Sequence, residues 1–478
     1  MTASTSSASV ARGDDNKGYQ RLGGLRLLAV VAWLVIWQLA SFAVGSRLLL
    51  AGPLETVLCL AGLVVRREFW ATVAFSLVRI AAGFVASFVL ALALASVARR
   101  LRVVEEFVAV GLGAVKSVPV VCIVVLLLMF VGSRNVSAVA VFLVALPALY
   151  FAAFEALGNL DSGMGELLDA CGVRGLRRVL GHVWPSMHPF LVATCKNVVG
   201  MSWKAGVAAE LVGMPLGSMG ERIYQTKLLL ETGELFAWTI VVVVLAAMSE
   251  RAFLALLARS VDVSLHLATR ARSMAGGGAS VDETPLEARL EDVTVSFEGT
   301  EVLSGANLVV GAGERACLSD PSGSGKTTLL RLLAGILKPD AGAVMVGSGD
   351  GPARVSTMPQ ETHLLESVSA VGNVAFLAGE WLDEAAIREL LLEVLGPDEL
   401  DRPVSELSGG QRRRVELVRA VARPSGMVLL DEPFASLDAS SVNASVAFVM
   451  RHLRGRTLVV ASHLAGTAGL LDARELGS

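Results

Sequence analysis

Long apolar stretches dominate residues 1–258 of the chain, and they limit its fold more than any other feature. A helix needs about 20 mostly apolar residues to cross roughly 30 Å of hydrocarbon. Stretches of this kind predict an N-terminal all-α polytopic membrane domain over residues 25–258, with about six transmembrane helices. The predicted spans are Leu25–Val44, Ala71–Val97, Phe107–Val131, Val136–Phe154, Pro189–Val212 and Leu235–Leu257.

The composition changes after this region. Charged residues make up only 18% of the whole chain, against about 25% in soluble proteins, which agrees with a large lipid-embedded part. The segment "MAGGGASVDETP" from Met274 to Pro285 is rich in glycine and polar residues and predicts a linker, taken as 259–286. Residues 287–478 then have the pattern of a soluble α/β domain. The net charge of −3 does not indicate a nucleic-acid partner, and the scattered cysteines are expected to be small core residues.

The distribution of Lys and Arg predicts the orientation. These residues are more frequent in the segments on the N-terminal side of the spans than on the other side, which places the tail 1–24 in the cytoplasm. An even number of spans places the C-terminal domain on the same side. The first apolar stretch is longer than a signal-peptide core, so we interpret it as a retained membrane anchor. The sequence therefore predicts a multi-pass protein of the cytoplasmic membrane.

Five ionisable residues fall within or at the ends of the predicted spans. Each would cost about 2.5 to 3.5 kcal/mol at the centre of a membrane helix, so each is expected to face protein or water. Snorkelling or pairing between helices is one explanation, and a place in a translocation path is the other. The residues are Arg79, Lys116, Lys196, Lys204 and Glu210.

The soluble half contains the stretch "DPSGSGKTT", which has the pattern of a phosphate-binding loop except that Asp320 occupies the first glycine position. A strand over Arg315–Asp320, a glycine-rich turn and a helix over Lys326–Ile336 would direct backbone N–H groups and a helix dipole at phosphate. Lys326 would reach the β- and γ-phosphates, and Thr327 would hold Mg²⁺. The predicted ATP-binding residues of the loop are Ser322, Gly323, Ser324, Gly325, Lys326, Thr327 and Thr328.

A second motif, "MVLLDEP" over Met427–Pro433, is an apolar strand that ends in two carboxylates. Asp431 is placed to bind Mg²⁺, and Glu432 is placed to polarise the water that attacks ATP. Between the two motifs, "LSGGQ" over Leu407–Gln411 matches the signature of the ABC ATPase superfamily. The soluble half therefore resembles that superfamily, and its predicted fold is an α/β P-loop ABC-type ATPase domain.

This resemblance implies further roles. Gln360 resembles the glutamine that touches Mg²⁺ and the coupling helix, and His463 resembles the switch histidine that contacts the γ-phosphate. Asp438 lies in a "SLD" sequence similar to the D-loop, and Phe297 lies where an aromatic ring stacks on adenine. In the family, the signature residues serve ATP held on the opposite subunit; here they are Ser408, Gly409, Gly410 and Gln411.

The loop between the fourth and fifth predicted spans carries Glu166, Gly172 and Pro185 at a characteristic spacing. It resembles the cytoplasmic loop of permeases of binding-protein-dependent ABC importers, although Leu167 and Leu168 replace the two alanines of that pattern. The physical expectation is a short helix, a turn that glycine permits, and a second helix that ends near the proline. In the family this element is the coupling helix, which takes up motion from the ATPase. The stretch "SLVRIAAGF" is similar to permeases of the nitrate, sulfonate and taurine type.

These features together predict a permease fused to its ATPase. Each ATP site needs a phosphate loop from one subunit and a signature from another, so a homodimer with two composite sites is expected. A separate extracytoplasmic solute-binding protein would deliver a small solute. The alternatives are an ABC exporter and an ATP-gated membrane signalling complex that moves no substrate. The ATPase is expected to be active, because every other catalytic residue is intact and Asp tolerates the left-handed backbone angles that the missing glycine would adopt. A carboxylate that faced the phosphates would weaken ATP binding, whereas one turned away would cost little.

Overall fold

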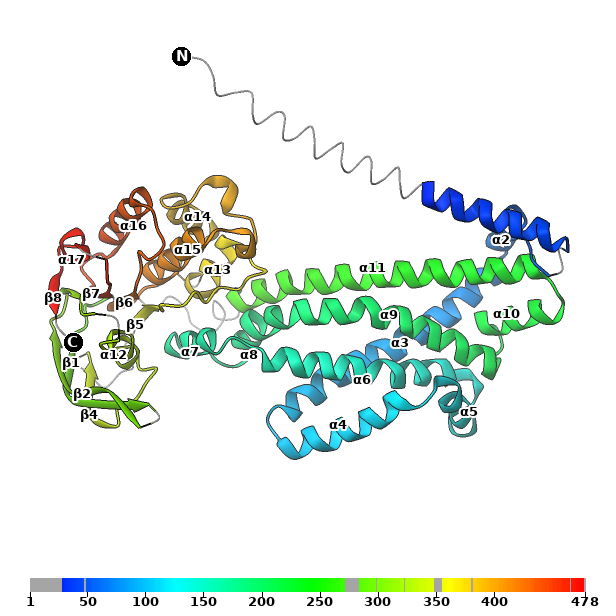
Figure 1. The fold of residues 1–478 in the computed structure, drawn as a ribbon, viewed down its shortest axis with the longest axis horizontal. Helices are drawn as coiled ribbons and strands as arrows, with labels where there is room; N and C mark the ends of the chain where they lie inside the picture. Colours follow the sequence, from blue (N-terminus) through cyan, green and yellow to red (C-terminus); the bar gives the residue numbers. More distant parts are fainter. Residues whose placement is uncertain are drawn as a thin grey trace, which may run out of the picture. The chain divides into compact units, whose positions relative to one another are not determined.

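The computed structural model describes residues 28–46, 49–270, 283–297, 299–321, 323–347, 355–379, 381–464 and 466–476 (Figure 1). The predicted tail 1–24, residues 271–282 of the predicted linker, and Ser322 lie outside the described residues. The chain divides into two compact units, Met1–Glu155 with Phe190–Ala255 and Ala156–Pro189 with Leu256–Ser478. By this division the loop after the fourth predicted span groups with the C-terminal domain.

The first unit contains helices and connecting loops but no strand among its described residues, and three of its helices continue into the second unit. The three shared helices are α6 (Val136–Gly158), α9 (Trp184–Gly213) and α11 (Thr232–Arg270). The others are a helix over Leu28–Val44, α2 (Pro53–Val64), α3 (Arg67–Ala98), α4 (Arg102–Ser117), α5 (Val120–Phe130), the 3-10 turn η1 (Ser133–Asn135) and α10 (Met219–Leu228).

Among the described residues, three helical segments are long and apolar enough to cross a membrane: Arg67–Ala98, Ser133–Gly158 and Thr232–Ala268. The predicted third span is not one straight helix, because α4 and α5 meet at a bend of 105°. Pro119 precedes α5, and a proline disfavours helical angles in the residue before it. If that pair counts as one span, the number rises to 4. Helix α9 does not meet the criterion; it carries Lys196, Lys204 and Glu210.

The ionisable residues of the first unit differ in their surroundings. Glu210 is fully buried, and its carboxylate accepts hydrogen bonds from the Ser76 hydroxyl (2.7 Å) and the Gly220 amide (3.3 Å). Arg79 donates to the carbonyl oxygen of Arg134 at 2.6 Å. Both residues therefore contact neighbouring helices, which is the pairing explanation. The side chains of Lys116, Lys196 and Lys204 are exposed.

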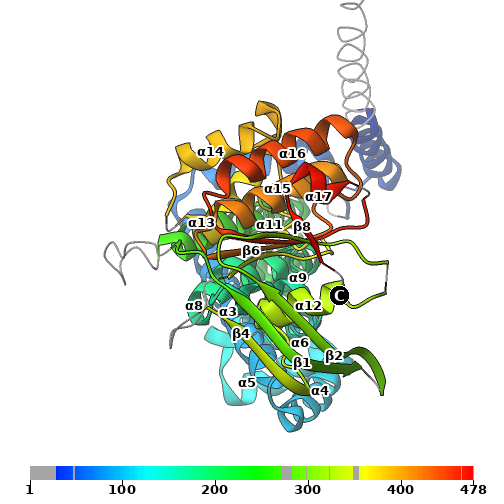
Figure 2. The same ribbon diagram turned by 90° about the vertical axis from the view of Figure 1, so that its left-hand side faces the viewer.

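The second unit contains two sheets (Figure 2). One is antiparallel, with the strand order β2-β1-β4, and the other is parallel, with the order β5-β6-β7-β3-β8. The strands are β1 (Ala288–Phe297), β2 (Thr300–Val310), β3 (Arg315–Leu318), β4 (Ala341–Val346), β5 (Val355–Met358), β6 (Met427–Asp431), β7 (Thr457–Ala461) and β8 (Arg474–Leu476).

The central strands β6 and β7 are continuous runs of buried residues, as expected for parallel strands covered on both faces. Val428 and Leu430 of β6 belong to a core with α13 (Ala370–Ala378), α15 (Gly409–Ala422) and α16 (Ala439–His452). Met427 and Leu429 belong to a core with α12 (Lys326–Leu333) and the antiparallel sheet. The helices are α12 (Lys326–Leu333), α13 (Ala370–Ala378), α14 (Glu384–Leu392), α15 (Gly409–Ala422), α16 (Ala439–His452) and α17 (Thr467–Leu470), with 3-10 turns η3 (Pro397–Glu399) and η4 (Val404–Glu406).

The topology of the parallel sheet gathers the predicted site residues at one edge. Strands β5, β6, β7 and β3 are consecutive neighbours, and they run in the same direction. Their carboxyl ends lead to Gln360, to Asp431 and Glu432, to His463, and to the phosphate loop. Ligands of open parallel sheets bind outside this edge.

The loop after α6 forms α7 (Ser162–Ala170), α8 (Gly175–Arg178) and the π-helical turn η2 (Val179–Val183). Gly172 has a φ of 69°, as the predicted glycine turn requires. The expectation that the second helix ends near Pro185 is wrong, since η2 continues directly into α9. The Trp184 amide donates to Val179, five residues back, and this wider turn accommodates a proline in the first turn of α9.

Candidate functional site

The phosphate loop connects the end of β3 to the start of α12. Gly323 and Gly325 adopt left-handed angles with φ of 89° and 90°, which glycine permits without strain. The Lys326 ammonium donates to the carbonyl oxygens of Asp320 and Pro321. Asp320 does not adopt a left-handed angle, so the tolerance expected of it is not needed here. The position requires no glycine for its backbone.

A set of oxygen atoms lies beside the phosphate loop. The Thr327 hydroxyl donates to Gln360 Oε1 at 3.3 Å, and Asp431 is 4% exposed. Burial raises the pKa of Asp431, although a hydrogen bond with Thr327 opposes the shift. The three residues line a cavity of about 310 Å³. A hydroxyl, an amide oxygen and one carboxylate form the kind of set that holds Mg²⁺ together with substrate phosphates. The residues therefore fit the predicted metal.

Glu432 follows β6 and lies against His463. Its amide donates to the Ala461 carbonyl at 2.8 Å, and its Oε1 accepts from the His463 amide at 3.0 Å and lies 2.8 Å from His463 Nδ1. The φ of Glu432 is 49°, an uncommon angle for a residue with a side chain. Glu432 and His463 line a second cavity of about 430 Å³ together with Ser436. A buried carboxylate paired with a histidine at the rim of a cavity can accept a proton from water.

The signature residues begin helix α15. Ser408 Oγ accepts from the Gln411 amide at 3.3 Å, and Gln411 Oε1 accepts from the Ser408 amide at 2.7 Å, which is a reciprocal capping box. Gly409 and Gly410 form the first turn. None of the four lines either of the two cavities described above.

Two further predicted residues lie at the ends of elements. Asp438 is the N-cap residue of α16, and hydrogen bonds from Ser440 and Ser441 lower its pKa to about 2. Phe297 is the last residue of β1, and its side chain is exposed. An exposed ring at this place is available for stacking.

The loop after α6 is bound to the ATPase elements within the second unit. Glu166 of α7 forms an ion pair with Arg331 of α12, with 2.7 Å between Oε2 and a guanidinium nitrogen. Asp161, which caps α7 by accepting from the Gly163 amide, lies 2.7 Å from Nδ1 of His363. Burial opposes ionisation of Asp161, but the hydrogen bond and charge of His363 and two backbone amides outweigh it, so the pKa of Asp161 is lowered.

Close steric contacts accompany these polar ones. A Cβ atom on Gly163 would lie 2.1 Å from the His363 ring, and one on Gly181 would lie 1.9 Å from the Phe376 ring. Arg177 also donates to the Phe376 carbonyl at 2.9 Å. The apolar contacts form one cluster that includes the end of α11: Met164, Leu167, Leu168, Cys171, Val173, Ala268, Leu365, Val368, Phe376 and Leu377.

Comparison with protein-family models assigns both halves of the chain. Residues 69–263 match the model described as "Binding-protein-dependent transport system inner membrane component", and residues 303–435 match the model described as "ABC transporter". One segment of the chain is therefore similar to the permease component of ABC transport systems, and a second segment is similar to their ATPase.

Several curated proteins that are similar to part of this chain are import ATP-binding proteins. Aliphatic sulfonates import ATP-binding protein SsuB 1 of Nocardia farcinica is 41% identical over 156 residues, which are 32% of this chain and 62% of the relative. Spermidine/putrescine import ATP-binding protein PotA of Fusobacterium nucleatum is 38% identical over 159 residues, or 31% of this chain and 42% of the relative. The chain thus spans about half the length of these relatives.

Sequence reasoning missed several residues of this candidate site. Arg331, His363 and Phe376 were not predicted, because their role depends on contacts with a loop far away in the chain. Arg413 and Glu416 were also missed, although a signal existed. They stand beside Val415, Leu417 and Val418 in α15, and charged residues next to an apolar helix face are candidates for a buried network.

Proposed function

We propose that the protein is an ATP-driven importer of a small solute, built as a permease and ATPase half-transporter. The main observation behind this proposal is the ion pair between Glu166 and Arg331. Glu166 lies in the part of the chain that matches a permease model, and Arg331 lies on the helix that begins at the phosphate loop. A change at the nucleotide therefore has a short mechanical route to the permease loop.

The described residues support Mg²⁺-dependent ATP hydrolysis. Lys326 and the α12 N-terminus would bind the phosphates. The Lys326 ammonium now donates to the carbonyls of Asp320 and Pro321, and phosphate oxygens would replace these carbonyls as its acceptors. Thr327, Gln360 and Asp431 would hold Mg²⁺, which neutralises charge on the phosphates. Glu432 would accept a proton from the attacking water, with His463 as its partner.

A homodimer completes the site in this proposal. The signature residues Ser408–Gln411 lie at a helix N-terminus and line neither cavity next to the catalytic carboxylates. A phosphate bound there would belong to a second copy of the chain, and the first copy would receive the signature of its partner. The multi-pass placement in the cytoplasmic membrane and the cytoplasmic location of the ATPase are part of the same proposal.

Import rather than export is supported by the permease model and by relatives that are import ATP-binding proteins. The relatives differ in solute, so the proposal names only a small solute presented by a separate extracytoplasmic binding protein. ATP and Mg²⁺ are the remaining small-molecule partners, and nucleic acid is not among them.

Reconstitution of the full chain in proteoliposomes tests the proposal. We expect ATP turnover that needs Mg²⁺ and falls by about 10²- to 10⁴-fold in Glu432→Gln, which removes the general base. Uptake is measured with ATP on the ATPase side and candidate binding proteins of the same organism on the other. Uptake without any binding protein, or outward movement only, would contradict import. ATP turnover without movement of any solute would favour a signalling role.

A further inference from the structure

Helix α15 carries three charged residues on one buried face. Arg413, Glu416 and Arg419 are spaced by three residues, and their side chains are 6%, 0% and 3% exposed. The carboxylate of Glu416 lies 3.1 Å from Arg413 and 3.3 Å from Arg419. Buried charges are costly, and a well-packed apolar set is often at least as stable. Stability alone therefore explains the triad poorly, and its contacts point to another role.

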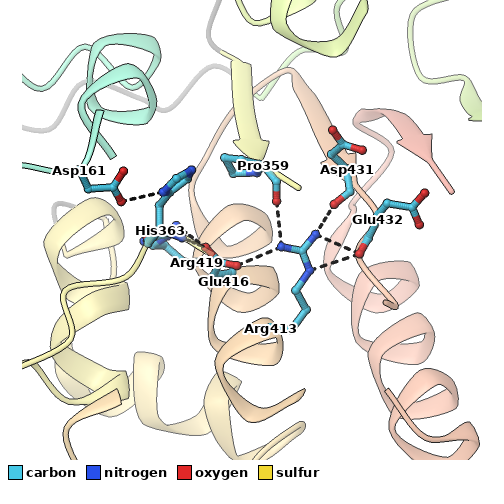
Figure 3. A network of polar contacts seen from close by, with 8 residues as sticks. All are labelled: Asp161, Pro359, His363, Arg413, Glu416, Arg419, Asp431 and Glu432. Atoms are coloured by element: carbon cyan, nitrogen blue, oxygen red, sulfur yellow. Dashed lines mark hydrogen bonds and ion pairs between the residues drawn. The ribbon is translucent and has the colours of Figure 1, made fainter. Parts of the chain in front are cut away.

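Arg413 binds the backbone of the catalytic turn. Its guanidinium donates to the Glu432 carbonyl at 2.9 and 3.2 Å, to the Asp431 carbonyl, and to the Pro359 carbonyl at 2.8 Å. Figure 3 shows the Asp431 and Glu432 carboxylates directed away from Arg413, which contacts only the main chain of these residues. The left-handed angle of Glu432 is strained for a residue with a side chain and persists only where its surroundings hold it. Arg413 supplies three of those contacts.

Glu416 and Arg419 hold the segment after Gln360 in the same way. Glu416 Oε1 accepts from the His363 amide at 2.7 Å, and Arg419 donates to the His363 carbonyl at 2.6 Å. The peptide groups on both sides of His363 are thereby attached to α15, while its imidazole contacts Asp161 (Figure 3). One continuous polar path therefore leads from Asp161 through His363 and Glu416 to Arg413 and Glu432.

We propose that Arg413 and Glu416 are positioning residues that set the catalytic turn of Glu432 and tie it to the permease loop through His363 and Asp161. This role rests on the proposed ATPase function. Movement of the loop that displaces His363 would be transmitted through the Glu416 carboxylate to the guanidinium that holds Glu432. Occupation of the site by nucleotide would act on the loop through the same contacts.

The test compares Arg413→Gln with a matched variant, Arg456→Gln. Arg456 is also buried, at 2% exposure, and donates to the carbonyls of Leu453, Arg423, Val421 and His452, none of which belongs to the catalytic turn. For the reconstituted full chain we expect Arg413→Gln to lower kcat at least tenfold with the KM for ATP changed less than threefold. Arg456→Gln should lower the melting temperature and leave kcat unchanged below it.

Conservative variants keep the test valid if Arg413→Gln does not fold. Glu416→Gln removes the negative charge that faces Arg413, and its kcat should fall. Arg413→Lys retains the positive charge beside Glu416 and one carbonyl contact, so its kcat should lie between those of the native chain and Glu416→Gln. Equal kcat in the native chain, Arg413→Lys and Glu416→Gln would overturn the positioning role. If Arg413→Gln and Arg456→Gln lose kcat and melting temperature in parallel, the role of Arg413 is structural only. That result would also overturn the positioning role.

The link to the loop has its own readout. Asp161→Asn keeps the cap on the Gly163 amide but removes the charge next to His363, and His363→Gln removes the ring. Each should lower uptake per ATP hydrolysed, and the double variant should lower it no further than the stronger single variant. Additive losses would overturn the path. Absence of turnover in the native chain would contradict the proposed function itself, whereas native turnover that Arg413→Gln leaves intact would contradict only this inference.

Discussion

Glu166 and Arg331 lie 165 residues apart in the chain, and their side chains meet at 2.7 Å. Glu166 is 44% exposed and Arg331 is 38% exposed, so water screens the pair. A pair of this exposure contributes little to stability, of order 0–1 kcal/mol. Its importance lies in the elements that it connects, the loop helix α7 and the phosphate-loop helix α12.

Reversal of one charge in this pair should uncouple transport from hydrolysis. In Glu166→Arg, two cations would face each other, and we expect uptake per ATP to fall about 5- to 150-fold, the range of ordinary coupling free energies. The melting temperature should change little. The double variant Glu166→Arg with Arg331→Glu restores opposite charges and should recover most of the uptake. Equal uptake in all three proteins would show that the pair plays no part in coupling.

The contact of Gly181 with Phe376 predicts a steric effect. Gly181→Ala would place a methyl group 1.9 Å from the ring of Phe376, and such overpacking costs about 1–3 kcal/mol. Thermal unfolding of the full chain should show this loss, and addition of Phe376→Leu should remove part of it. Gly469→Ala is the control, because a Cβ there meets nothing within 4 Å. A Gly181→Ala protein as stable as the control would mean that the loop does not pack as described.

His182 predicts a dependence of stability on pH. Burial lowers its pKa from 6.5, so the folded state binds fewer protons than the unfolded state between the two values. The contribution to stability is therefore present above pH 6.5 and is lost as the pH falls through the folded pKa. Asp161 acts in the same direction only near or below pH 3.8, since its pKa is lowered from that value.

We expect the melting temperature to fall between pH 7 and pH 5.5, and to fall less steeply in His182→Gln. Burial also lowers the pKa of His188 from 6.5, so the slope should shrink in the variant rather than vanish. Melting curves at several pH values for both proteins measure the difference. A slope that is equal in the two proteins would argue against a buried neutral imidazole at position 182.

At position 320 we expect the charge of the side chain, and not the backbone conformation, to affect the KM for ATP. Because its φ is not left-handed, Asp320→Asn and Asp320→Gly should behave alike. Removal of a negative charge beside the phosphate loop should lower the KM for ATP by about fivefold in both variants, which corresponds to roughly 1 kcal/mol, the energy of two charges 4 Å apart in water. Steady-state ATP turnover measures this. A gain in Asp320→Gly that Asp320→Asn lacks would show that the backbone, not the charge, limits the native loop.

Much of this molecule is local in sequence and could be predicted. The apolar runs predict membrane helices by composition, and the phosphate loop, the carboxylate pair and the signature are contiguous motifs with known geometry. The two-domain class that they predict is confirmed by the family models. Local rules were less successful at Pro185, where a π-turn accommodates a proline that was expected to end the helix.

Contacts between distant segments could not be predicted, because local periodicity says which face of an element is buried but not what buries it. Glu166 was identified from its spacing, whereas its partner Arg331 is an ordinary helix residue until the fold brings the two together. The charges of Arg413, Glu416 and Arg419 signalled a buried network, but only the tertiary structure attaches it to the carbonyls of Glu432 and His363. The sequence alone thus determined that the chain has a membrane domain and a nucleotide site. The packing of the 156–189 loop against α12, α13 and the segment after β5 decided how the loop and the nucleotide site are joined, because that packing depends on the shapes and charges of segments far apart in the chain.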